Sequence, residues 1–146
     1  MSVALSARPL SMARALRELD GDRLGGVVVF AGRVRPDRTE SGPVVALDYE
    51  ADPALALDRL RALEREARRR FGARRVVLWH RVGRVPVGGV AVIVGVATPH
   101  RAPAFAATQY LIDALKATVP IWKTDRGRSG RRRRPPPAPR PSRSAG

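Results

Sequence analysis

Cysteine is absent from the 146-residue sequence, and long apolar runs are absent with it. Without cysteine the chain has no disulfide, no thiolate metal ligand and no thiol nucleophile. The longest apolar runs, such as residues 90–97, fall far short of the ~20 residues that a membrane-spanning helix needs. The first residues also lack the apolar core of a secretory signal. We therefore expect a cytoplasmic protein.

Lysine is almost absent as well. Only two of the 28 basic residues are lysines, Lys116 and Lys123, and both lie in the segment LKATVPIWK, residues 115–123. A lysine near a helix end complements the helix dipole, and a lysine beside Trp122 can be an ordinary surface residue. Arginine serves these roles equally well, whereas only lysine supplies an amine that can lose its proton or attack a carbonyl. On the residues alone, a structural and a functional role are equally favoured.

Positive charge is what the sequence has in excess, with a formal net charge of +15. Residues 125–146 hold eight arginines and one aspartate, a net charge of +7, which leaves +8 for residues 1–124. A basic body favours anionic ligands or an acidic partner surface. The last 22 residues contain no apolar side chain larger than alanine or proline. We therefore predict one domain, residues 1–124, followed by a disordered basic tail, residues 125–146.

Periodicity and turn residues predict that helices and pairs of strands alternate along the chain. Asp52 and Pro53 are typical of a helix start, and Gly72 of a helix end. The predicted elements are a short helix between Ser11 and Gly21, strands at 25–35, 44–50, 74–85 and 89–99, and helices at 53–71 and about 101–118. Two strand pairs between three helices favour an α+β fold over a doubly wound sheet.

Two short arginine-containing motifs are candidates for anion binding. Arg33 and Arg35 are two residues apart at the end of a predicted strand, so their side chains share a face and can form a fork for phosphate or carboxylate. His100 and Arg101 open a predicted helix, where free N–H groups favour an anion. For each motif a solvated or locally packed role is at least as well supported. His80, within a predicted strand, is assigned a structural role, and the chain's two histidines, without cysteine or paired carboxylates, predict no metal site.

The length of the last predicted helix bears on how these candidates combine. A helix over residues 101–118 separates His100 from Lys116 by about 24 Å, at roughly 1.5 Å per residue. No small substrate spans that length. The two residues therefore serve different sites or meet across a subunit interface, and we favour a homodimer with a composite site.

Five motifs follow one another through about residues 10–124: VVVFAGRVR, LDYEADP, WHRVGRVPVG, VATPHRAPAF and LKATVPIWK. In order and spacing they resemble the catalytic subunit of molybdopterin synthase. The resemblance implies an α+β hammerhead-like fold of β-hairpins and two long helices. It also implies a homodimer with a small ubiquitin-like sulfur-carrier subunit docked at each end, which together form a heterotetramer.

The resemblance further implies an enzyme of molybdenum cofactor biosynthesis that needs no cofactor of its own. The small subunit inserts its Gly-Gly C-terminal tail, carried as a thiocarboxylate. Sulfur passes from that tail to cyclic pyranopterin monophosphate and forms the dithiolene of molybdopterin. Pterin phosphate is an anion, which suits the basic body of the chain.

Particular residues acquire roles through the same resemblance. Lys116 and Lys123 are expected to be the catalytic residues beside the inserted thiocarboxylate. The expected substrate-binding residues are Arg33, Val34, Arg35, His100, Arg101, Lys116, Lys123, Thr124 and Asp125, with His100 and Arg101 supplied by the neighbouring subunit, and Phe30 and Ile112 are expected to line the pocket. The chain departs from the family after the second lysine, where the arginine–proline tail replaces an acidic segment.

Two other functions fit parts of the sequence. The arginines of the tail favour a nonspecific nucleic-acid-binding protein, although the tail has no aromatic residue on which a base can stack. An inactive homologue that only holds the small subunit is the other alternative.

Overall fold

Three helices and eight strands occupy the part of the chain that the structure, a computed structural model, describes: residues 2–40 and 42–127. The helices are α1 (Met12–Glu18), α2 (Pro53–Phe71) and α3 (Arg101–Thr118). The strands are β1 (Val3–Ser6), β2 (Gly26–Arg33), β3 (Arg38–Thr39), β4 (Gly42–Ala51), β5 (Arg75–Arg81), β6 (Gly83–Pro86), β7 (Val90–Thr98) and β8 (Ile121–Gly127). The α+β class predicted from the sequence is confirmed.

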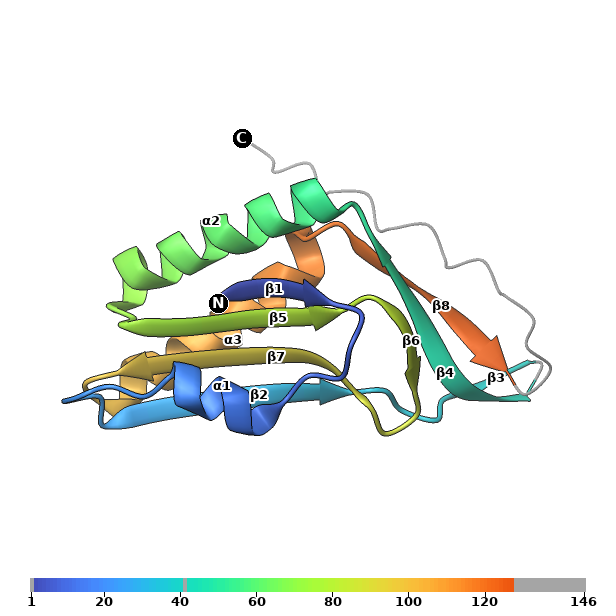
Figure 1. Cartoon of the computed structure of the whole chain (residues 1–146), viewed down its shortest axis with the longest axis horizontal. Coiled ribbons are helices and arrows are strands. Elements are labelled where there is room, and N and C mark those ends of the chain that lie inside the picture. Colours follow the sequence, from blue (N-terminus) through green and yellow to red (C-terminus); the bar gives the residue numbers. More distant parts are fainter. Residues whose placement is uncertain (1, 41, 128–146) are drawn as a thin grey trace.

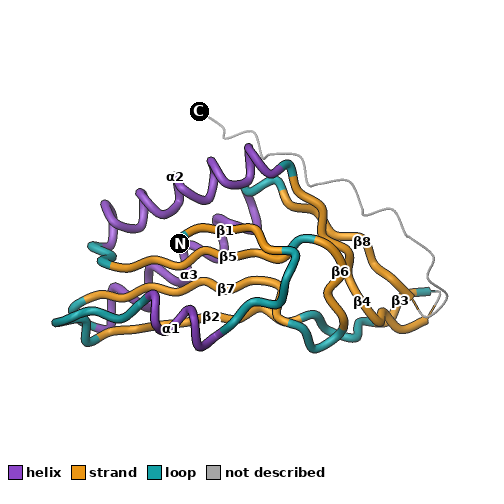
Figure 2. The backbone as a smooth tube through the Cα atoms, viewed as in Figure 1, coloured by secondary structure: helices purple, strands orange, loops and turns teal. Residues whose placement is uncertain are grey.

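The strands form two sheets that lie end to end (Figure 1). The first sheet has the order β1-β5-β7-β2, in which β1 runs parallel to β5 while β5 and β2 run antiparallel to β7. In the second sheet β4 pairs with β3, β6 and β8. Figure 2 shows β8 following β4 along its length. The last helix thus leads directly from the first sheet into the second.

Helices cover both faces of the first sheet. On one face, alternate residues of β5 and β7, such as Leu78 and Val94, pack in one core cluster with α2 and α3. On the opposite face, Val77 and Ile93 pack with α1. Because both faces are buried, β5 and β7 read as continuous apolar runs rather than as an alternating pattern.

The ends of α2 are set by local chemistry, as the sequence predicted. The Asp52 side chain accepts a hydrogen bond from the backbone N–H of Leu55, and Pro53 follows at the first helical position. Gly72 ends the helix in the left-handed conformation, with φ of 66°, which a residue without a Cβ adopts without strain. The predicted bounds 53–71 are confirmed, as are those of the last helix, 101–118.

Several predictions about strand pairing were wrong. The segment 74–85 splits at Gly83, whose φ is 85°, so that β5 belongs to the first sheet and β6 to the second. Residues 86–89, PVGG, form a turn between the strands predicted at 74–85 and 89–99, but this turn connects strands of different sheets. The two strands predicted at 25–35 and 44–50 also lie in different sheets rather than in one hairpin, and β2 pairs with β7 instead.

The domain boundary predicted at Thr124 lies within a strand. Strand β8 continues to Gly127 and pairs with β4 along its length, so residues 125–127 belong to a sheet and not to the predicted tail. The remainder of that tail, residues 128–146, lies outside the described residues.

A paired substitution on α2 tests the packing of this helix. Leu63 is fully buried in the core, whereas Leu55 of the same helix is 60% exposed. We expect Leu63→Ala to lower the free energy of unfolding by about 2–5 kcal/mol, because it removes buried methyl groups and leaves a cavity. Leu55→Ala should change it by less than about 0.5 kcal/mol. Urea denaturation measures both, and equal effects would contradict the packing described.

Candidate active site

Lys116 lies in the last turn of α3, which ends two residues before Pro120. The helix buries a stripe that includes Ile112 and Leu115, and Lys116 follows Ile112 by four residues, at the edge of that stripe. The lysine itself is exposed. The core therefore holds the backbone of Lys116 in place while its side chain remains accessible.

Lys123 lies on β8, directly after the turn at Pro120. In the antiparallel pairing with β4 it is opposite Tyr49, so the two side chains project from the same face of the second sheet. Lys123 is exposed as well. The helix ends two residues before Pro120, since proline cannot continue it, and pairing with β4 determines where the second lysine lies.

Two aromatic rings connect the surroundings of the lysines. The ring of Tyr49 contacts the ring of His80 edge-on, with 4.9 Å between centroids and 71° between planes. Lys116 is near enough to His80 for its charge to lower the pKa of the imidazole. Lys116 on α3 thus acts on His80 through its charge, while Tyr49 on β4 both contacts His80 and lies opposite Lys123 on β8.

Burial is the main cause of the pKa shifts of both rings, and a different neighbouring charge adds to each. Burial is the main reason that the pKa of His80 is lowered, its hydrogen bond with the Arg81 carbonyl opposes this, and the Lys116 charge adds to the lowering. Burial also raises the pKa of Tyr49, and the nearby Asp125 carboxylate raises it further. The phenol therefore stays protonated and the imidazole stays neutral at pH 7.

The arginine pair at the end of β2 does not form the fork that the sequence predicted. The Arg33 side chain donates through Nε to the Gly88 carbonyl at 3.0 Å. Arg35 pairs with Asp37 at 3.4 Å, in an ion pair whose arginine side chain is 80% exposed. Each guanidinium thus has its own protein partner, and Arg35 is the more accessible cation. Val34 between them is buried.

His100 and Arg101 lie at the opposite end of α3 from Lys116. His100 is the N-cap residue, but its side chain makes no capping hydrogen bond and both residues are exposed. The backbone of both residues packs on Gly26, and a Cβ added to Gly26 would come within 2.8 Å of that backbone. They border a hollow of about 400 Å³ with Gly25, Pro99 and Ala102. The locally packed role that the sequence left open for His100 is therefore not one of side-chain capping.

The remaining predicted residues are divided between surface and core. Phe30 is 37% exposed on β2, opposite Val94, whereas Ile112 belongs to the core cluster that also contains Val94. Thr124 and Asp125 lie on β8, opposite Asp48 and Leu47. Asp48 is buried and forms ion pairs with Arg126 and Arg84, which connect β4 to β8 and to β6.

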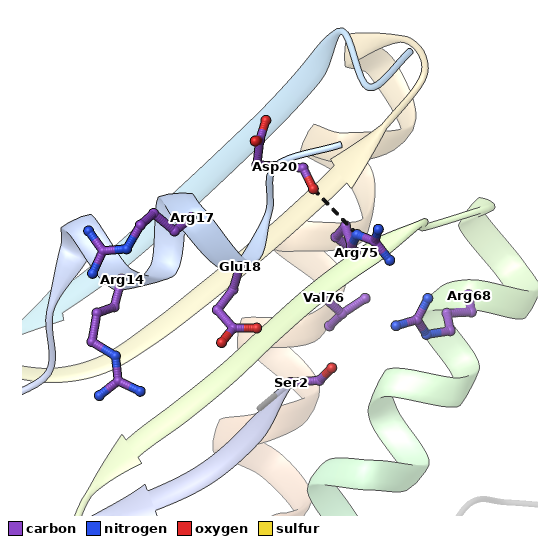
Figure 3. A pocket seen from close by; sticks show the side chains of 8 residues that line it. All are labelled: Ser2, Arg14, Arg17, Glu18, Asp20, Arg68, Arg75 and Val76. Carbon is purple, nitrogen blue, oxygen red and sulfur yellow. Dashed lines mark hydrogen bonds between the residues drawn. The ribbon is translucent and has the colours of Figure 1, made fainter. Parts of the chain in front are cut away.

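A separate hollow of about 460 Å³ lies between α1, α2 and β5 (Figure 3). Its charged lining consists of Arg14, Arg17, Glu18, Asp20, Arg68 and Arg75. Arg68 is paired with Glu64 at 3.0 Å, and Arg75 donates to the Asp20 carbonyl at 3.4 Å. This hollow contains none of the residues that the sequence predicted for the site.

Sequence reasoning assigned His80 a structural role and did not single out Tyr49. The signal that could have drawn attention to His80 is its rarity, since the chain has two histidines. Among residues 2–40 and 42–127, no group of three or more histidine or acidic side chains could hold a metal ion. In the same part of the chain, no helix is long and apolar enough to cross a membrane.

Residues 5–118 match the family model described as MoaE protein. The chain belongs to the MoaE family. A molybdopterin synthase catalytic subunit from Nostoc sp. is 40% identical over 130 residues, which cover 88% of this chain and 78% of the relative. Catalytic subunit 1 from Mycobacterium tuberculosis is 36% identical over 126 residues, which cover 86% and 85%.

Solved structures agree with this MoaE assignment. Molybdopterin synthase from Staphylococcus aureus superposes with a TM-score of 0.78 at 30% identity, covering 83% of this chain and 88% of the other. A MoaE protein from Burkholderia ambifaria superposes with a TM-score of 0.77 at 27% identity, covering 90% and 87%. The family resemblance carried by the five sequence motifs is confirmed.

Proposed function

We propose that this chain is the catalytic subunit of a molybdopterin synthase, acting through the surface that joins Lys116 to Lys123. Its family and its catalytic-subunit relatives assign it to molybdenum cofactor biosynthesis. The donor is the thiocarboxylated C-terminus of a small ubiquitin-like subunit, and the acceptor is cyclic pyranopterin monophosphate. The observation that carries the proposal is that Tyr49, which lies opposite Lys123, contacts the ring of His80, on which the charge of Lys116 acts.

The two lysines supply what this reaction requires of a protein. Attack by a thiocarboxylate on a pterin needs positive charge where negative charge develops, and a group that moves protons. A lysine amine does both, whereas arginine keeps its proton. Because Lys116 and Lys123 are the only two lysines in the sequence and the family resemblance places both beside the thiocarboxylate, we assign catalysis to them.

The anionic acceptor is held by cations around the same surface. Arg35 is an exposed cation two residues beyond β2, and it follows Arg33, the last residue of that strand, and the buried Val34. The substrate-binding set also includes Thr124 and Asp125, which lie one and two residues after Lys123 on β8. Phe30, exposed on β2, contributes an apolar wall, and Ile112 supports it from the core.

His100 and Arg101 reach this site from a second copy of the chain. Helix α3 separates them from Lys116 by about 24 Å, at roughly 1.5 Å per residue, so one subunit cannot present all three to one small substrate. A homodimer with composite sites meets this requirement. With one small subunit at each end, the assembly is a cytoplasmic heterotetramer.

No specific observation favours the rival functions. The nucleic-acid alternative depends on residues 128–146, which lie outside the described residues. The scaffold alternative predicts no special arrangement of the two lysines, yet the charge of Lys116 acts on His80 and Lys123 lies opposite Tyr49, the ring partner of His80.

Reconstitution separates these functions. Purified chain is mixed with thiocarboxylated small subunit and cyclic pyranopterin monophosphate, and molybdopterin is measured. We expect product from the full chain and from a chain ending at Gly127, since β8 ends there. No product, with DNA retarded only by the full chain, would favour nucleic-acid binding. A stable complex without product would favour the scaffold.

A further inference from the structure

Arg81, the last residue of β5, is a buried cation that the proposed chemistry leaves unused. It is 8% exposed. Among residues 2–40 and 42–127, no carboxylate forms an ion pair with it. Its Nε is buried and has no hydrogen-bond partner within the same residues. A buried charge without a counter-ion destabilises a folded protein, so stability alone does not explain an arginine at this position.

The guanidinium of Arg81 connects three segments of the chain. Its Nη2 donates to the backbone carbonyl of Ala7 at 3.3 Å and to that of Arg84 at 3.2 Å. Ala7 lies in the loop between β1 and α1, and Arg84 lies on β6. Because Nη2 carries two protons, the two bonds use both of them. The side chain thus ties the end of β5 to a loop beside the first sheet and to a strand of the second sheet.

These hydrogen bonds lie at the corner where the chain passes from one sheet to the other (Figure 1). β5 ends at Arg81 and β6 begins at Gly83, so Val82 alone separates the two strands. The Val82 N–H donates to the Ser6 carbonyl at 2.9 Å, which continues the pairing of β1 with β5 up to the corner. The bond from Arg81 to the Arg84 carbonyl spans the corner and therefore restrains the angle between β5 and β6.

The two lysines lie on opposite sides of this corner. Lys116 follows Leu115, which packs in one core cluster with residues of β5 and β7 and so belongs to the first sheet. Lys123 lies in the second sheet, opposite Tyr49 of β4, and Tyr49 is in turn opposite Gly83 of β6. One row of paired residues thus leads from Lys123 straight to the corner. The angle at the corner therefore determines where Lys123 lies relative to Lys116.

We propose that Arg81 is a positioning residue for Lys123: by bracing the corner between β5 and β6, it sets the second sheet, with Lys123, against the first sheet, with Lys116. The proposal rests on the proposed function, because that function requires both lysines beside one thiocarboxylate. A buried charge can fix one conformation at the expense of stability. A misplacement of about 1 Å, even from a distant substitution, can lower turnover by about 10²-fold.

The angle between the sheets can be measured directly, because the chain has no cysteine and accepts a pair of introduced ones. Gln109→Cys on α3 and Val45→Cys on β4 place nitroxide labels at two exposed positions, one on each side of the corner. Labelled chain is diluted with unlabelled chain, and pulsed electron paramagnetic resonance measures the distance between the labels. With Arg81 present we expect one narrow distance distribution. Arg81→Met, which has no donor, should shift or broaden it, and Arg81→Gln, whose amide still donates to one carbonyl, should do so less.

Turnover of the unlabelled chains should follow the same order. We expect Arg81→Met to lower kcat for molybdopterin formation by about 10²-fold, and Arg81→Gln by about tenfold. Arg75→Met is the matched control, because Arg75 lies on the same face of the same strand and its Nε also donates to a carbonyl, that of Asp20. It lies about 20 Å from the corner, at roughly 3.3 Å per residue. Its kcat should stay within about twofold of wild type, with the distance distribution unchanged.

Urea denaturation shows whether each variant folds, and if Arg81→Met does not fold, Arg81→Gln decides the question. An unchanged distance distribution, a changed distribution with wild-type kcat, or equal effects of Arg75→Met would each overturn the positioning role. A lower urea midpoint with wild-type distances and kcat would make Arg81 a stabilising residue only. These results leave the proposed function standing, whereas a wild-type chain that makes no molybdopterin refutes the proposed function and the positioning role with it.

Discussion

Lys116→Arg should reduce molybdopterin formation by about 10²- to 10⁴-fold, the usual contribution of a positioned acid or base. Arginine preserves the positive charge at the end of α3 and its favourable interaction with the helix dipole, but it does not release a proton at neutral pH. Binding of the small subunit should therefore persist while turnover is lost. Single-turnover assays of molybdopterin, together with calorimetric titration of the small subunit, measure the two effects separately.

A matched control lies on the same helix. Gln109 is exposed on α3, and its amide donates a hydrogen bond to Asp113. Gln109→Arg introduces the same side chain into the same helix and should leave turnover within about twofold of wild type, as expected for a surface substitution. Wild-type turnover by Lys116→Arg would show that charge alone suffices at this position.

Two inactive variants should restore activity to each other. Lys116→Ala and the double variant His100→Ala/Arg101→Ala damage opposite ends of α3. In a homodimer with composite sites, a mixed dimer contains one site with both defects and one site with neither. Random exchange makes half of all dimers mixed, so the mixture should recover about a quarter of wild-type activity. Subunits are exchanged under mild denaturation and molybdopterin is then measured.

The alternative to a composite site has a different outcome. If each subunit contained all of its own catalytic groups, every site in the mixture would carry one defect and activity would stay at the level of the separate variants. A mixture of Lys116→Ala with Lys123→Ala is the control, because these two residues lie in the same half of a site and should not complement.

Local features of the fold could be predicted from the sequence because their causes are local. Asp52, Pro53 and Gly72 determine the ends of α2 through backbone conformations and hydrogen bonds within a few residues. Pro120 ends α3 by the same kind of argument. By contrast, the apolar first half of residues 25–35 suggested a strand buried on both faces, and this was wrong, because Val27 and Phe30 of β2 are 43% and 37% exposed.

Strand pairing could not be predicted in the same way, because it depends on partners distant in the sequence. The pairing of β1 with β5 joins Val3 to Leu78, and that of β4 with β8 joins Tyr49 to Lys123. β8 also carries Trp122, Thr124 and charged residues, so it lacks the apolar pattern of a core strand, and its partner β4 gives it its conformation. The contact of Tyr49 with His80 likewise joins two different sheets.

The candidate site, like the fold, could be predicted from the sequence only in part. The rarity of lysine is enough to single out Lys116 and Lys123, since in an arginine-rich chain an amine stands out. The sequence does not single out His80 and Tyr49 in the same way, because each lies in a predicted strand and looks like an ordinary strand residue. Their relation to the lysines depends on α3, β5, β4 and β8 meeting at one place.

The scarcity of lysine also makes the central claim directly measurable, namely that a partner's C-terminal tail lies between Lys116 and Lys123. A zero-length carbodiimide joins a carboxylate only to an amine in contact with it, and the chain offers two lysines and its N-terminus. The small subunit, with its C-terminal glycine as a carboxylate, is mixed with the full chain, crosslinked and analysed by peptide mass spectrometry. We predict an isopeptide bond from that glycine to Lys116 or Lys123. A complex whose C-terminal glycine couples to neither lysine, or only to the N-terminus, would contradict the account.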